Sequence, residues 1–127
     1  MNNSDAVKTM IQKAESKLKT AWIDFESGQY DDSASRSYYA IFHAISAALF
    51  SKGLNYSSHG QTIGAFNREF IKSGIFPREY MLAIQKLFDE RQTGDYDVFS
   101  SIDRDTASEC AEDARKLIDG IKKYLNL

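Results

Sequence analysis

The chain has 127 residues, 43% of them hydrophobic and 27% charged, and its formal net charge is −2 at pH 7. This composition excludes a disordered or fibrous protein, and the length is that of one domain covering residues 1–127. Because no block of Lys and Arg is present, nucleic-acid binding over a broad cationic surface is disfavoured, and only a small local site remains open. One cysteine, no long apolar run and no signal-peptide layout predict a soluble cytoplasmic protein without membrane association.

Apolar residues recur at three- and four-residue spacing along most of the chain, and strand-like alternation is nowhere sustained. The pattern predicts an all-α bundle. The expected helices, in chain order, cover residues 5–27 and 32–52 and then start at Ser58, near Pro77 and at Thr106. Ser58 and Thr106 each have a Gln or Glu three residues later, which is capping-box spacing. Four glycines are expected to end helices: Gly28, Gly53, Gly74 and Gly94.

The expected helix over residues 32–52 has two apolar faces. One carries Tyr38, Ile41 and Ile45, and the opposite face carries Tyr39 and Ala40 among others. A helix that is apolar nearly all round is usually buried on both sides. We therefore expect its second face to pack against another part of the chain or against a second subunit.

Arg36 and His43 interrupt that second face, two helical turns and roughly 10 Å apart. One interpretation is catalytic: the histidine would transfer a proton, and the arginine would stabilise the charge of a phosphodiester. The other is structural: Arg36 would pair with a carboxylate of a neighbouring helix, and His43 would be a hydrogen-bonded interior residue. The spacing alone favours the structural interpretation.

Arg91 continues the apolar face of the fourth expected helix, and Asp95 and Tyr96 follow just past the glycine expected to end it. A buried guanidinium must be paired, because its desolvation is otherwise too costly. Asp95 or Asp97 is therefore expected to fold back onto it, as a structural pin at the helix end. We expect Arg36 and Arg91 both to be shut away from water among acidic or aromatic neighbours.

Other candidate residues give weaker signals. Cys110 lies on a stripe of small apolar residues, where cysteine behaves as a small hydrophobe. His59 has no metal-ligand companions. The sequence contains no glycine-rich phosphate loop, nucleophile elbow or paired cysteines. It therefore predicts neither a metal nor a cofactor.

Three stretches together resemble the HEPN domain family (higher eukaryotes and prokaryotes nucleotide-binding): "GQYDDSASRSYYAIFHAISAALFSKG", "SSHGQTIGAF" and "LFDERQTGDYDVF". The resemblance covers nearly the whole chain and is closest to the small stand-alone prokaryotic members, a branch catalogued as an uncharacterised protein family. Its most specific parts are "RSYYA", which starts at Arg36, and "RQTGDY", which starts at Arg91.

The resemblance implies an up-and-down bundle of four to five helices that dimerises, often encoded beside a minimal nucleotidyltransferase as a toxin–antitoxin pair. It also implies that active members are metal-independent ribonucleases, whose motif is an Arg followed four to six residues later by a His. Arg91 matches that Arg, but Asp95 stands before Tyr96 where active members have the His. A carboxyl with an ordinary pKa of about 3.9 is a poor acid–base group at neutral pH. Arg36 and His43 have the literal spacing but lie in another helix.

Two functional hypotheses follow. The first is a homodimeric interaction module that partners a minimal nucleotidyltransferase in a toxin–antitoxin or nucleotide- and RNA-related system. The alternative is a metal-independent ribonuclease toxin. The binding or structural cluster is expected to contain Arg36, Tyr39, His43, Arg91, Asp95 and Tyr96. The catalytic candidates are Arg36, His43, Arg91 and Tyr96. The missing histidine favours the first hypothesis, and a third possibility is that the cluster only stabilises the fold.

Overall fold

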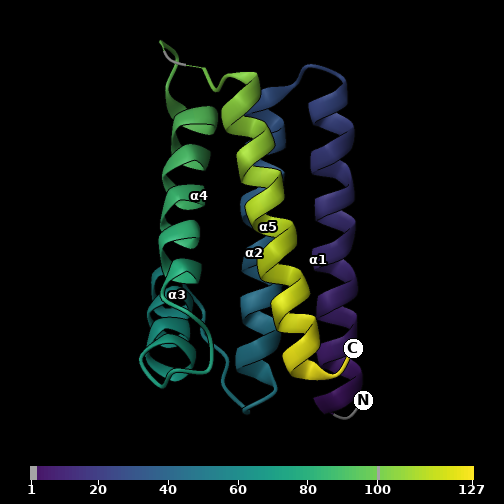
Figure 1. Ribbon diagram of the computed structural model, residues 1–127, viewed down its shortest axis with the longest axis vertical. Helices are drawn as coiled ribbons and strands as arrows, with labels where there is room; N and C mark the ends of the chain where they lie inside the picture. The colour runs from purple at the N-terminus through teal and green to yellow at the C-terminus, as the bar shows by residue number, and fades with distance from the viewer. Residues whose placement is uncertain (1–2, 100) are drawn as a thin grey trace.

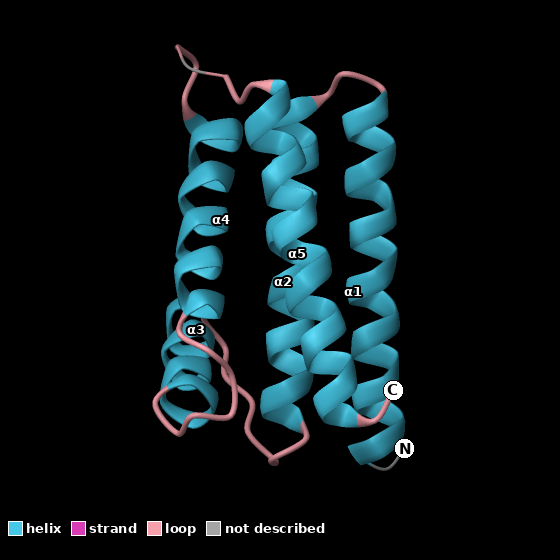
Figure 2. Cartoon of the chain, in the orientation of Figure 1, coloured by secondary structure: helices cyan, strands magenta, loops and turns pink. Residues whose placement is uncertain are grey.

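The computed structural model describes residues 3–99 and 101–127, and all of its regular structure in those ranges is helical (Figures 1 and 2). The elements are α1 (Asn3–Glu26), α2 (Tyr30–Phe50), α3 (His59–Phe66), the π-helical turn η1 (Asn67–Ile71), α4 (Glu79–Tyr96) and α5 (Arg104–Leu125). The four long helices lie alongside one another and alternate in direction, with the short α3 beside the start of α4 (Figure 1). The expected all-α, up-and-down bundle is confirmed.

Two helix starts show how local chemistry sets the boundaries. The Ser58 hydroxyl accepts a hydrogen bond from the backbone N–H of Gln61 at 3.1 Å, which confirms the predicted start of α3. The start of α5 differs from the prediction, because Asp103 and not Thr106 caps it. The Asp103 carboxylate accepts from the backbone N–H of Thr106 at 2.8 Å, so the helix begins at Arg104.

The prediction that Gly94 ends the fourth helix is wrong. Gly28, Gly53 and Gly74 do have φ values of 77°, 77° and 84°, as helix-ending glycines do. Gly94 instead lies inside α4, where a Cβ would stand 3.2 Å from the backbone oxygen of Asp31. Glycine is thus needed there for a close approach between helices, and α4 continues to Tyr96.

Helix α2 lies at the centre of the bundle and contacts α1, α3, α4 and α5. Tyr38, Ile41 and Ile45 of its first apolar face are fully buried, and so are Ala40 and Ala47 of the opposite face. The small alanine side chains allow neighbouring helices to approach closely. The buried part of the second face is therefore covered by the same chain.

The core continues from α2 into an aromatic group. Phe66, Phe70 and Phe76 stack on one another, with ring centroids 5.2 to 5.8 Å apart. On α5, Cys110 is fully buried, and burial, followed by the charge of Glu90, raises the pKa of its thiol to about 12. No helix in the described part of the chain is both long and apolar enough to span a bilayer.

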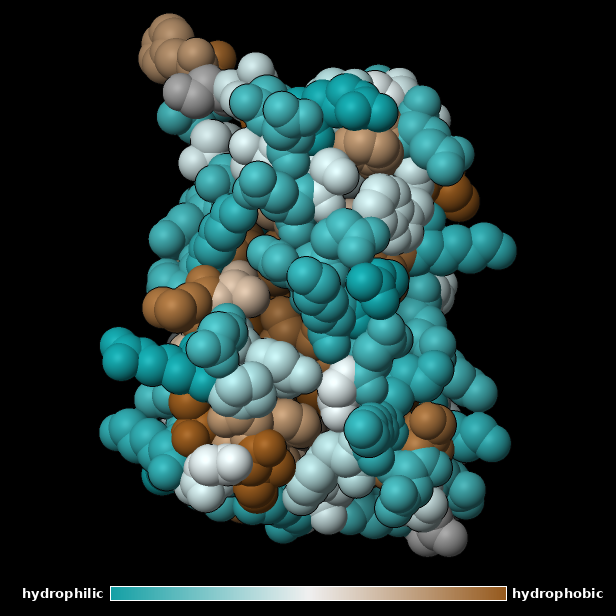
Figure 3. Space-filling view, viewed as in Figure 1, coloured by the Kyte–Doolittle hydropathy of each residue, from teal (hydrophilic) through white to brown (hydrophobic). Residues whose placement is uncertain are grey.

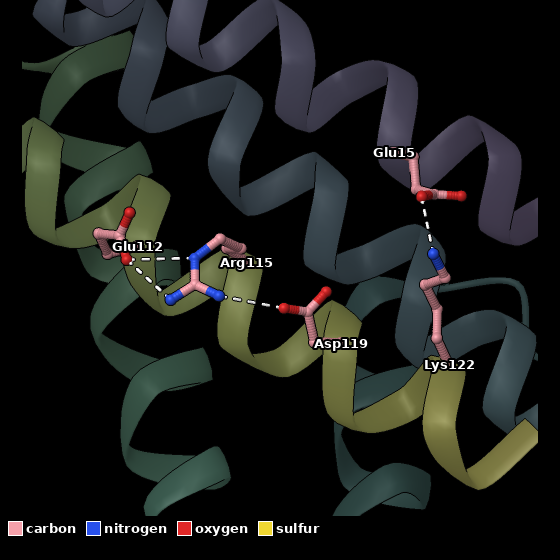
Figure 4. Close-up of polar contacts among 5 residues, drawn as sticks. All are labelled: Glu15, Glu112, Arg115, Asp119 and Lys122. Atoms are coloured by element: carbon pink, nitrogen blue, oxygen red, sulfur yellow. Dashed lines mark hydrogen bonds and ion pairs between the residues drawn. The ribbon is translucent and has the colours of Figure 1, made fainter. Parts of the chain in front are cut away.

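The outer surface of α5 is charged, and several of its charges form ion pairs. Arg115 lies between Glu112 and Asp119, with N–O distances of 3.0 and 3.1 Å, and Lys122 reaches Glu15 of α1 at 3.0 Å (Figure 4). Hydrophilic side chains accordingly cover much of this face of the molecule, and hydrophobic ones gather mainly over the α3 end (Figure 3).

Candidate functional site: a tyrosine-linked arginine and a basic cleft

Arg91 lies near the end of α4 among three tyrosine rings. Its guanidinium carbon is 5.3 Å from the ring centroids of Tyr38 and Tyr39 and 5.6 Å from that of Tyr96. Nη2 donates a hydrogen bond to the Tyr39 hydroxyl at 2.7 Å, and Nε lies 3.3 Å from an Asp95 carboxylate oxygen. The side chain is only 13% exposed, so these contacts replace most of its hydration.

The ion pair of Arg91 forms within α4, because Asp95 is one helical turn further along the same helix. The expectation that a loop folds back onto the arginine is therefore wrong in its geometry, although Asp95 is the partner. Burial alone would lower the pKa of Arg91, but the Tyr39 hydrogen bond and the nearby Tyr96 and Asp95 outweigh it and raise that pKa. Arg91 thus stays charged and held in place.

Tyr39 also forms part of a second group of residues, which we call the basic cleft. It is a surface hollow of about 330 Å³ between α1, α2 and the start of α3. Its seven lining residues include five basic side chains and no carboxylate. They are Lys13, Lys17, Arg36, Tyr39, Phe42, His43 and His59.

The structure corrects the expectation for Arg36. Its side chain is exposed and, within residues 3–99 and 101–127, has no carboxylate partner. Lys13 is also exposed and Lys17 is partly exposed; both come from α1, one turn apart, and neither has a carboxylate partner within those residues. The cations of α5 in Figure 4 are paired with carboxylates, whereas the three cations of the cleft face open space. The cleft therefore has a locally positive potential in a protein whose net charge is negative.

Both histidines of the cleft are held neutral near pH 7. The pKa of His43 is lowered by burial and then by the charges of Lys13 and Lys17. The pKa of His59 is lowered by burial and then by Arg91. A neutral imidazole carries one donor and one acceptor nitrogen, so each ring can still exchange or share a proton with a ligand.

The candidate cluster predicted from the sequence is thus divided into two groups that share one residue. Tyr39, Arg91, Asp95 and Tyr96 meet at the end of α4. Arg36, Tyr39 and His43 meet in the basic cleft. Sequence reasoning missed the two α1 lysines and His59; the i, i+4 spacing of Lys13 and Lys17 was the available signal, since it places them on one helix face.

The last residue of α4 and the loop that follows it expose apolar side chains. Tyr96 is 66% exposed, and Val98 and Phe99, just beyond the helix, are 87% and 97% exposed. Together with Gln92, Thr93 and Asp97 these residues line a shallow surface hollow. Neighbouring apolar side chains this exposed are a feature of contact surfaces.

The protein is thus an up-and-down helical bundle. It holds a basic cleft beside an arginine that is enclosed by tyrosine rings. Residues 7–124 match the HEPN domain, and the chain belongs to the HEPN domain family. The family resemblance inferred from the sequence is therefore confirmed.

Two relatives align with most of this chain and with most of their own length, and one solved structure has a similar fold. The chain is 31% identical over 114 residues to a UPF0332 protein of Thermotoga maritima, which covers 90% of this chain and 86% of that protein. It is 34% identical over 121 residues to a Methanocaldococcus jannaschii protein with the name "Putative toxin MJ0605". The aligned part covers 95% of this chain and 90% of that protein. The fold is similar to that of TT1696 from Thermus thermophilus, with a TM-score of 0.79, 16% identity and coverage of 97% and 98%.

Proposed function

We propose that this HEPN protein is an RNA-directed toxin that binds single-stranded RNA in the basic cleft and cleaves it without a metal ion. The observation that carries the proposal is the lining of the cleft, in which Lys13, Lys17 and Arg36 have no carboxylate partner within the described residues and His43 stands among them. The names of two Methanocaldococcus jannaschii relatives, both described as putative toxins, agree with it.

Binding would rest on charge and on stacking. Three cations can contact successive phosphates of one strand, because counterion release rewards clustered Lys and Arg. The ring of Tyr39 lies in the same cleft, where a base can stack on an aromatic side chain. A volume of about 330 Å³ is enough for one nucleotide unit but not for a duplex, which favours a single strand.

Cleavage would use His43 as a base. The 2′-oxygen of the RNA attacks the adjacent phosphorus, His43 takes the 2′-hydroxyl proton, and the bond from phosphorus to the 5′-oxygen breaks. The leaving 5′-oxygen takes a proton from water, and the hydroxide so formed takes the proton from His43, which regenerates the base and the water. The products are a 2′,3′-cyclic phosphate and a 5′-hydroxyl. Arg36 would stabilise the charge on the phosphorane oxygens. The lowered pKa of His43 keeps its imidazole free to accept that proton at pH 7.

Arg91 has a different part in this proposal. Its guanidinium is occupied by the Tyr39 hydroxyl and by Asp95, and it is largely enclosed. It would therefore position Tyr39 at the wall of the cleft instead of contacting the scissile phosphate.

The test is cleavage of a single-stranded RNA labelled at its 5′ end, in EDTA, with the products analysed for cyclic phosphate. We expect the wild-type chain to cleave, and Arg36→Ala and His43→Ala to lose activity by about 10²-fold or more. The matched control is Arg115→Ala, which removes a surface arginine on α5 (Figure 4) and should retain activity. A wild-type chain that does not bind RNA, or cleavage that is equal in the His43→Ala protein, would refute the proposal.

A second candidate function has its own observation. The exposed Tyr96, Val98 and Phe99 form an apolar tip that would be covered in a homodimer or by a nucleotidyltransferase partner. This is the interaction module that the sequence favoured, and it is compatible with the first proposal, since the tip and the basic cleft have no lining residue in common. We propose a second copy of the chain as the occupant of this tip, in line with the dimers implied by the family resemblance.

Sedimentation at micromolar concentration tests this candidate. The wild-type protein should sediment at twice the chain mass, and Phe99→Asp should shift it to a monomer. Leu82→Asp, which changes another exposed apolar residue on α4, serves as the control and should leave the dimer intact. A monomeric wild-type protein rules out the second copy.

A further inference from the structure

His59 is a residue of the cleft for which the sequence pattern predicts no role. It is the first residue of α3, and its backbone is fixed by the cap residue Ser58, which accepts hydrogen bonds from Gln61 N–H and the Thr62 hydroxyl at 3.1 and 2.8 Å. Its ring stacks on that of Phe42, with centroids 4.0 Å apart and planes inclined by 22°. The imidazole therefore has one orientation, set by its own helix end and by α2.

The Tyr38 hydroxyl determines which ring nitrogen of His59 carries the proton. Its oxygen lies 2.8 Å from His59 Nδ1, and the tyrosine is fully buried. Burial, partly offset by Arg91, raises the pKa of Tyr38 to about 12, so the phenol keeps its proton at neutral pH. Within the described residues, His59 Nδ1 is its one hydrogen-bond acceptor. A buried O–H without an acceptor is costly, so Tyr38 donates and His59 Nδ1 accepts.

We propose that His59 is a phosphate-binding residue of the basic cleft, which presents its Nε2–H to the RNA backbone because Tyr38 occupies its Nδ1. This inference rests on the proposed function. Nδ1 is directed at a buried hydroxyl, so the opposite edge of the ring is the one that faces the cleft it lines. A neutral imidazole donor can stabilise an anionic oxygen without giving up its proton, and His43 remains the base.

The charged groups around His59 agree with a fixed neutral donor. Arg91 faces it from α4, Arg36 and His43 belong to the same cleft on α2, and Lys13 and Lys17 belong to it on α1. Burial, followed by the charge of Arg91, lowers the pKa of His59 and so disfavours a positive charge on the ring. Tyr38 thus acts as a positioning residue, since it reaches the phosphate only through His59.

Two measurements test the inference. Nitrogen-15 NMR of the free protein should show His59 as the Nε2–H tautomer, with Nδ1 shifted as a hydrogen-bond acceptor. Binding is measured with a 2′-O-methyl RNA, which has the phosphates but no nucleophilic hydroxyl. We expect His59→Ala and Tyr38→Phe each to weaken binding about tenfold. The matched control is Tyr80→Phe, the same change at a partly buried hydroxyl that packs against Gly120 of α5, and it should not alter binding.

The outcomes separate the two proposals. If the wild-type chain binds no RNA, both fail. If RNA binds but the His59→Ala protein retains full affinity, or if NMR shows the Nδ1–H tautomer, the proposed role of His59 alone is refuted. Should Tyr38→Phe be too unstable to purify, the tautomer in the wild-type protein and the affinity of His59→Ala decide the question.

Discussion

Tyr39 and Arg91, 52 positions apart in the sequence, are joined by a hydrogen bond of 2.7 Å from Nη2 to the phenol oxygen. The bond connects α2 to the last turns of α4, and the same tyrosine lines the basic cleft. Because the Arg91 side chain is mostly enclosed, a change at this position should act first on stability. It would act on the cleft through Tyr39 and through its charge beside His59.

Replacing Arg91 with alanine should destabilise the fold. The change removes the Tyr39 hydrogen bond and the contacts with three tyrosine rings, and it leaves Asp95 without its ion-pair partner. We expect the free energy of unfolding to fall by about 2–4 kcal/mol, somewhat less than the roughly 3–5 kcal/mol of a fully buried pair, because Asp95 is partly hydrated. Urea denaturation followed by circular dichroism measures it.

Arg115→Ala is the control for that measurement, because Arg115 is exposed and its ion pairs lie on the surface (Figure 4). Exposed pairs contribute little, so this variant should unfold close to the wild-type midpoint. Equal stability of the Arg91→Ala and wild-type proteins would show that the contacts of Arg91 with Tyr38, Tyr39 and Tyr96 do not stabilise α4.

Gly94→Ala should also destabilise the protein, although alanine is the better helix former. A Cβ at this position would stand 3.1 Å from Ile102 Cδ1 and 3.2 Å from the Asp31 backbone oxygen. The backbone cannot move aside easily, because the Asp31 carboxylate accepts a hydrogen bond from the Ile102 N–H at 2.8 Å. We expect a loss of about 1–3 kcal/mol from overpacking, measured by thermal and urea unfolding.

Gly64→Ala is the control, and this variant should be more stable than the wild-type protein instead of less stable. Gly64 lies in α3, and a Cβ there would meet nothing within 4 Å. Alanine should stabilise this helix by about 0.5–1 kcal/mol. If both glycine variants are stabilised, α4 and α2 lie far enough apart at Gly94 to admit a methyl group, and the overpacking argument is wrong.

Stability should decrease as the pH falls from 7 to 5. The pKa values of His43 and His59 are both lowered in the folded protein, by burial first and then by neighbouring cations. The unfolded chain, whose histidines titrate near about 6.5, then binds more protons than the folded chain, so the contribution to stability is complete above about pH 6.5 and is lost below it. Chemical denaturation across this range should show the decrease, and His43→Gln should make it shallower. A free energy of unfolding that does not change with pH would contradict the lowered pKa of both histidines.

RNA binding should depend on salt through the three cleft cations. For single strands the logarithm of the binding constant falls with the logarithm of salt by about 0.7 per phosphate contact. Lys17→Ala should therefore weaken binding of the 2′-O-methyl RNA and reduce that slope by about 0.7. Lys86→Ala is the control, since Lys86 pairs with Glu109 at 2.6 Å and does not line the cleft. An unchanged slope in the Lys17→Ala protein would place the RNA elsewhere.

Much of the fold could be predicted from the sequence, because helical periodicity and capping are local. Ser58 is an example: the residue and its partner three positions on are both visible in the chain. Gly94 shows the limit. A glycine that ends a helix and one that admits a neighbouring helix are identical in the sequence, and only the contact with Asp31 distinguishes them.

The candidate site could be predicted only in part for the same reason. Arg36, Tyr39 and His43 were visible as an interruption of an apolar face. His59 was not, because its partner Tyr38 is 21 residues away and its chemistry depends on that contact. The exposure of Arg36 was also missed, since a wheel projection places a residue on a face without showing whether a neighbour covers it.

The buried thiol has a practical consequence. With the pKa of Cys110 raised to about 12, almost no thiolate exists at neutral pH, and the core also shields the sulfur from reagents. The chain has no other cysteine. A cysteine introduced at position 17 would therefore be the sole site that a maleimide dye or photo-crosslinker labels, at the mouth of the cleft and with the native chain otherwise unaltered.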